Sequence, residues 1–116
     1  ERRVNLFLFL NGGWEESWGG HLELWHQNMS GCAARIAPKR NRVVIFSSTD
    51  FSYHGHPQPL ACPSNRSRRS LASYYYTAER PRAERDRAHS PDHLTLWQER
   101  RGRCPRKPEM KRRNTL

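Results

Sequence analysis

The sequence predicts a mainly β protein, built as a sandwich or a closed double sheet. Its apolar residues fall in short runs of strand length, such as 4–10 and 43–46, and turns that contain glycine or proline separate the runs. The first run is apolar at nearly every position, so both of its faces require cover, which a single solvated sheet would not provide. The length of 116 residues is typical of one modest domain.

Strands are expected, in chain order, at 4–10, 21–25, 43–46 and 69–77. Glycines follow the first run, and the pair Gly19-Gly20 precedes the second, because glycine permits positive φ and a tight reversal. The third run is short, apolar and rich in β-compatible residues, which favours a central strand. The fourth run alternates between two faces and ends in aromatic residues.

Beyond Thr77 the composition changes. Residues 78–99 are charged, with alanines at positions compatible with a helix, and a short helical extension is expected there. Residues 100–116 contain eight Lys and Arg against the single acid Glu109, and they have no apolar run. Such a segment cannot bury enough surface to offset its ordering entropy, so a disordered basic tail is expected.

The charge of the chain is unevenly distributed. The net charge is +10; residues 78–116 carry 12 Lys and Arg against six acids, and residues 1–77 carry nine against five. A basic excess favours contact with anionic partners, but a solvated basic tail is the commoner explanation. Nucleic acid is therefore not expected as a partner, although a small basic nucleic-acid-binding protein is retained as an alternative.

Three cysteines, Cys32, Cys62 and Cys104, form an odd set without Cys-x-x-Cys spacing. This pattern supports neither a disulfide framework nor a zinc site, so reduced thiols and a cytoplasmic location are expected. No apolar run is long enough to span a membrane, and no secretory signal is recognisable. A start at Glu1, directly before an apolar strand, indicates a chain cut inside a domain.

Five segments resemble, in order and at plausible spacings, the motifs of one enzyme family. They are Arg2 to Asn11, Trp14 to Gly20, His21 to Trp25, Ile36 to Phe46, and Ser52 to Pro57 followed by Arg69. The family is the prolyl 4-hydroxylase-like branch of the 2-oxoglutarate- and Fe(II)-dependent dioxygenases, and the resemblance covers residues 1–77. It implies a partial double-stranded β-helix, or jelly roll, that forms the C-terminal part of a catalytic domain and carries the basic extension.

The resemblance implies two site residues. His54, between Tyr53 and Gly55, resembles the second metal histidine of the family, and a neutral imidazole suits Fe(II). Arg69 resembles the arginine that binds the distal carboxylate of 2-oxoglutarate, because it lies six residues before Tyr75 on the face taken as inward. A slip of one residue would exchange Arg69 with Arg68.

Phe9 occupies a position where many relatives carry a tyrosine whose hydroxyl meets the co-substrate. The His-x-Asp motif that supplies the other metal ligands in the family does not occur in residues 1–116. Without those ligands, this chain by itself is expected to be inactive.

The implied function is hydroxylation of a C–H bond, on a prolyl or peptidyl substrate, coupled to the oxidative decarboxylation of 2-oxoglutarate. Fe(II), 2-oxoglutarate and dioxygen are implied, with ascorbate as an additional cofactor, and no membrane partner. The alternative from another class is a β-sandwich interaction module that kept the fold and lost the iron.

Other polar and aromatic residues are given ordinary structural explanations. His56 lies two residues after His54, so a His-x-His metal pair is conceivable but is not the favoured interpretation. The other histidines are expected to be solvated: His21, His26, His89 and His93. The tryptophans near the glycine turns are expected to be packing residues: Trp14, Trp18 and Trp25. The acids in this region are expected to be exposed: Glu15, Glu16 and Glu23.

Overall fold

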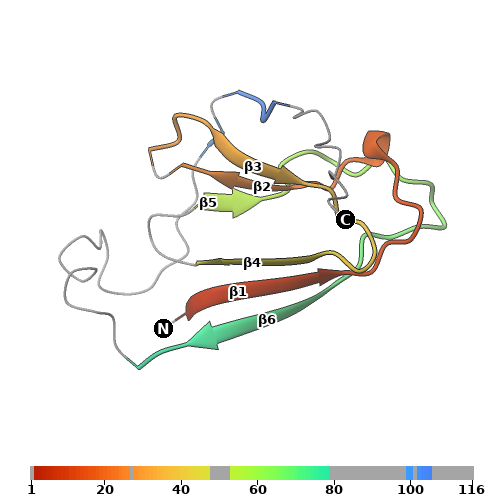
Figure 1. Ribbon diagram of the computed structural model, residues 1–116. Coiled ribbons are helices and arrows are strands. Elements are labelled where there is room, and N and C mark those ends of the chain that lie inside the picture. Colours follow the sequence, from red (N-terminus) through yellow and green to blue (C-terminus); the bar gives the residue numbers. More distant parts are fainter. Residues whose placement is uncertain (1, 27, 48–52, 79–98, 101, 106–116) are drawn as a thin grey trace, which may run out of the picture.

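The computed structural model describes residues 2–26, 28–47, 53–78, 99–100 and 102–105, and these form two facing antiparallel sheets of three strands each (Figure 1). The first sheet has the order β4-β1-β6, with β4 at Val43–Ser47, β1 at Arg2–Phe9 and β6 at Ser70–Tyr76. The second has the order β3-β2-β5, with β3 at Cys32–Ile36, β2 at Leu22–Trp25 and β5 at Tyr53–Gly55. A short 3-10 turn, η1, spans Glu16–Trp18. The expected mainly β fold is confirmed, and it is compatible with a jelly roll.

The central strand of the first sheet is β1. It pairs with both neighbours, so that Leu6 lies opposite Ile45 of β4 and Ser73 of β6. The expectation that residues 43–46 form a central strand was therefore wrong, since β4 lies at the edge of its sheet in the described part of the chain. Residues 43–46 are apolar because Val44 and Phe46 pack against the core, and not because β4 has a neighbouring strand on each side.

The core lies between the two sheets. Its buried members are contributed by both sheets, with partly buried apolar side chains packed around them: Phe9, Leu22 and Val44, then Phe7, Leu24, Ile36 and Phe46. Burying one such side chain stabilises the fold by about 1.5–3 kcal/mol. The opposite face of β1 is less covered by described residues, because Ile45 and Leu71 on its neighbours are exposed.

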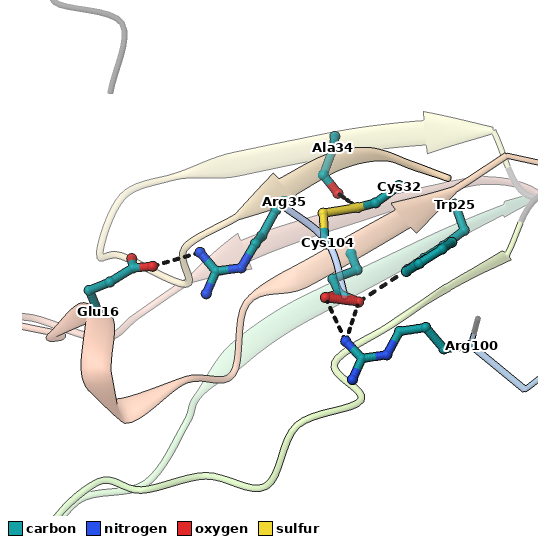
Figure 2. The surroundings of a disulfide bond; sticks show 8 residues. Glu16, Trp25, Cys32, Ala34, Arg35, Arg100 and Cys104 are labelled. Atoms are coloured by element: carbon teal, nitrogen blue, oxygen red, sulfur yellow. Dashed lines mark hydrogen bonds and ion pairs between the residues drawn. A yellow bond between two sulfur atoms is a disulfide. The ribbon is translucent and has the colours of Figure 1, made fainter. Parts of the chain in front are cut away.

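A disulfide joins Cys32 on β3 to Cys104 across 72 residues of sequence (Figure 2). Arg100 Nη1 lies 3.1 Å from Glu23 Oε1 of β2, so two contacts hold the segment near residues 100–104 against the second sheet. The expected reduced state was wrong for two of the three cysteines, and only Cys62 has a free thiol. Disulfides persist mainly in oxidising compartments, so the cytoplasmic location loses the support that free thiols had given it.

The expected helical extension at 78–99 and disordered tail at 100–116 lie mostly outside the described residues. Those that are described, 78, 99–100 and 102–105, adopt turn or irregular structure. Within the described chain there is also no helix with the length and apolar character needed to cross a bilayer.

Candidate functional site

A pocket of about 140 Å³ opens between the two sheets. We call it the inter-sheet pocket. It receives side chains from β1, β2, β5 and the start of β6, and its lining comprises Phe7, Phe9, Leu22, His54, Gly55, His56, Arg68 and Ser70. The pocket is therefore lined mostly by apolar side chains, to which His54, His56 and Arg68 add three nitrogen-containing groups.

His54 reaches this pocket from β5. Its backbone is in register with Leu24 of β2, and the Leu24 side chain packs on the core between the sheets. The His54 ring contacts the Phe46 ring of the opposite sheet, with 4.7 Å between the two centroids. The predicted metal histidine is therefore directed into the space between the sheets, although its side chain stays exposed.

His56 lines the same pocket two residues further along. Partial desolvation of the imidazole, and then the positive charge of Arg68, lower the pKa of His56 below its ordinary value, although the residue as a whole is exposed. A lowered pKa keeps the imidazole neutral at physiological pH, which is the state that accepts a hydrogen bond or binds a metal. Nonetheless, the described residues contain no group of three or more His, Cys, Asp or Glu side chains placed to hold a metal ion.

Arg68 supplies the guanidinium of the inter-sheet pocket. Its Nε donates a hydrogen bond of 2.8 Å to the Gly20 carbonyl oxygen, and its Cζ lies 5.3 Å from the centroid of the Phe9 ring. Gly20 has φ of +72°, and a Cβ added there would lie 2.9 Å from Arg68 Cδ. Gly20, expected only to help reverse the chain, therefore also makes room for this arginine.

Arg69 does not line the inter-sheet pocket and instead lines a second cavity, formed by loop residues beyond the ends of the strands of the first sheet. The Tyr74 ring contacts Phe7 between the sheets, whereas Tyr75 is 54% exposed, so the inward face of β6 is the one opposite to that expected. Alternation along an extended chain then directs Arg68 inward and Arg69 outward. The structure brings together His54 and Arg68, and it does not bring Arg69 to them.

A family model for the 2OG-Fe(II) oxygenase superfamily matches residues 1–76. The chain belongs to this superfamily. The match ends at the last residue of β6, so it includes both sheets and the inter-sheet pocket. No curated protein and no solved structure matches the chain. The resemblance expected from the motifs is thus confirmed at the level of the superfamily, whose members use Fe(II), 2-oxoglutarate and dioxygen.

Asn5 is a polar residue of this oxygenase domain that the sequence did not single out. It is fully buried on β1, and neither its Oδ1 nor its Nδ2 has a hydrogen-bond partner among the described residues. It lies opposite Phe46 on one side and Tyr74 on the other, on the same face of β1 as Phe7. A buried amide left unpaired costs about 1–3 kcal/mol, so Asn5 lowers the stability of the domain.

Two polar residues expected to be solvent-exposed, His21 and Glu23, are buried at the second sheet, whereas Glu15 and Glu16 are exposed as expected. His21 is buried, and its Nε2 lies 2.7 Å from Glu16 Oε2, while Arg35 Nη1 lies 2.6 Å from Glu16 Oε1. Partial burial would raise the pKa of Glu16, but the hydrogen bonds from Arg35 and His21 outweigh it and lower that pKa. Glu23 is also buried, and its Oε2 accepts a hydrogen bond of 3.1 Å from Trp25 Nε1.

The tryptophans have packing environments, as expected. Trp14 is buried, and its ring meets the Trp18 ring edge-on at 5.2 Å between centroids. Trp25 is buried beside Glu23. His26 is exposed, while His89 and His93 lie outside the described residues.

Proposed function

We propose that the chain is part of a 2-oxoglutarate- and Fe(II)-dependent dioxygenase of the prolyl 4-hydroxylase-like branch, which hydroxylates a C–H bond of a prolyl or peptidyl substrate. The observation that supports it is the inter-sheet pocket, which the imidazoles of His54 and His56 and the guanidinium of Arg68 line within the family-matched residues. These are the two kinds of group that an Fe(II) ion and the far carboxylate of 2-oxoglutarate require.

The donor chemistry of the pocket fits this pair of ligands. His54 would hold the metal through a neutral imidazole nitrogen, and His56 beside it would remain neutral near pH 7 because its pKa is lowered. Bound Fe(II), together with 2-oxoglutarate and dioxygen, would supply the oxidising chemistry, with ascorbate as an additional reductant. The protein's part would be to orient the substrate C–H bond and to exclude water.

Arg68 is the residue we propose for the co-substrate carboxylate. A planar guanidinium can donate two parallel hydrogen bonds to a carboxylate and remains charged, even though burial lowers the pKa of Arg68. Phe9, at the family position that often carries a tyrosine, lies against Arg68, which supports the same location for the carboxylate. Arg69 is the alternative residue for this carboxylate, because it lies six residues before Tyr75 in the sequence motif.

Further ligands must complete the metal site. A facial triad needs two histidines and one carboxylate, and His54 accounts for one of the three. We therefore propose that residues 1–116 alone do not turn over substrate, and that a longer natural chain containing them would.

The test is anaerobic binding of Fe(II) and 2-oxoglutarate, followed by the charge-transfer absorption that their joint coordination produces. We expect the band in a longer natural chain that contains residues 1–116, and its loss in His54→Ala. His26→Ala is the matched control, since His26 is exposed and lies outside the pocket. A folded longer chain without the band would favour the alternative of a non-catalytic β-sandwich module.

A further inference from the structure

A second cavity, of about 320 Å³, lies among loop residues that follow β1 and precede β4 and β6. We call it the arginine cavity. Its polar lining is Asn11, Arg40, Asn65, Arg66, Ser67 and Arg69. Ser67 and Arg69 line this cavity, whereas Arg68 and Ser70 line the inter-sheet pocket, as alternation along an extended segment requires. The two sites are therefore separate and lie on opposite sides of one segment.

The arginine cavity is positively charged without a compensating acid. Arg40, Arg66 and Arg69 all line it, and no Asp or Glu does. Arg66 donates to the Gly12 carbonyl oxygen, and Arg69 Nε donates to Ser67 Oγ at 3.1 Å. Within the described residues, none of the three guanidiniums forms an ion pair, so most of their N–H groups remain available to a ligand.

The walls of the cavity are fixed by a buried amide. The Asn11 side chain accepts a hydrogen bond of 2.6 Å from the Arg69 backbone N–H and donates one of 3.0 Å to the Arg69 carbonyl oxygen. The Asn11 side chain also donates to the Pro38 carbonyl oxygen at 2.7 Å, and the Asn11 backbone carbonyl oxygen accepts from the Arg40 backbone N–H at 3.0 Å. One side chain thus ties the segments that carry Arg40 and Arg69. Because these segments are already held in place, the protein loses less conformational entropy when a ligand binds between them.

We propose that the arginine cavity binds a compact polyanion, meaning a phosphate group or a small di- or tricarboxylate. Three guanidiniums that line one cavity without a carboxylate favour an oxyanion, and the planar donor fork of arginine suits both phosphate and carboxylate oxygens. The volume matches the lower end of small-ligand sites. The proposal is independent of the oxygenase site, because the two cavities share no lining residue.

The experiment is isothermal titration of residues 1–116 with inorganic phosphate and, separately, with citrate. Iron and 2-oxoglutarate are omitted, and chloride is adjusted to keep the ionic strength constant. We expect saturable binding of at least one anion, and the preferred anion distinguishes a phosphate ligand from a carboxylate ligand. Arg40→Gln should weaken it by about tenfold, because a charge-assisted hydrogen bond is removed.

Arg42→Gln is the matched control. It removes the same charge from the same turn, but Arg42 does not line the cavity and instead donates to the Ala37 carbonyl oxygen. If Arg40→Gln fails to fold, Arg40→Lys replaces it, and we expect weakened binding because the bidentate fork is lost.

Two results would overturn the proposal. One is the absence of saturable binding of either anion at constant ionic strength. The other is an equal loss of binding in Arg40→Gln and Arg42→Gln, which would indicate general attraction to a basic protein rather than a site.

Discussion

Reduction of the bond between Cys32 and Cys104 should destabilise the two-sheet domain. The bond closes a loop across 72 residues, and the chain-entropy relation for such a loop gives about 4.4 kcal/mol at 25 °C. Measured values for disulfides are often lower, so we expect a loss of about 2–4 kcal/mol. Release of the segment would also remove Arg100 from the buried Glu23 carboxylate, which adds to the loss.

The assay is urea unfolding of the oxidised chain with and without reductant, compared with Cys104→Ser and Cys32→Ser. Both variants should match the reduced protein, and reductant should no longer affect them. Cys62→Ser is the control, because Cys62 is a free thiol and should leave the response to reductant intact. Equal stability of the oxidised and reduced chains, or an equal effect of Cys62→Ser, would refute the reasoning.

Three further perturbations test the inter-sheet pocket. Gly20→Ala should destabilise the fold by about 1–3 kcal/mol, because φ is +72° there and the new Cβ would lie 2.9 Å from Arg68 Cδ; an unchanged urea midpoint would contradict this. Because the pKa of His56 is lowered in the folded chain, the unfolded chain binds a proton on this imidazole more readily than the folded chain does. The contribution of His56 to the free energy of unfolding should therefore be fully present above pH about 6.5 and be lost as the pH falls towards the lower pKa of the folded state. Urea unfolding between pH 8 and 5 should show this fall, and His56→Asn should reduce it; an identical pH profile in the variant would exclude His56 as its source. Asn5→Leu should leave the stability unchanged or raise it by about 1–3 kcal/mol, because it removes a buried amide without a partner among the described residues. A marked destabilisation would show that the Asn5 amide already has a partner.

The strands of the fold were largely predictable because their signals are local. The apolar run 4–10 and the alternating run 69–77 appear as β1 and β6, and the paired glycines fall at turns with positive φ. β3 was not predicted, because Cys-Ala-Ala-Arg-Ile has neither a clear alternation nor many β-branched residues. The edge position of β4 depends on which strands pair, and this is a property of the tertiary fold.

The candidate site was predictable in its residue types but not in its orientation. His54 could be located because its motif neighbours fix its position. The choice between Arg68 and Arg69 required the register of β6, and both faces of that strand carry aromatic residues, so the sequence does not mark the inward one. The pairing of Cys32 with Cys104 and the burial of Asn5 likewise arise from contacts between distant segments, which no local spacing encodes.

The most direct test of the account compares Arg68→Gln with Arg69→Gln for 2-oxoglutarate affinity, in a longer natural chain that contains residues 1–116 and binds Fe(II). The account predicts that Arg68→Gln weakens binding by about 2–3 kcal/mol, which is a factor of about 30–150, because a charge-assisted carboxylate contact is lost. Arg69→Gln should leave the affinity within a factor of about two, since Arg69 faces the arginine cavity. Loss of affinity in Arg69→Gln with Arg68→Gln unaffected would contradict the assignment of the inter-sheet pocket as the co-substrate site.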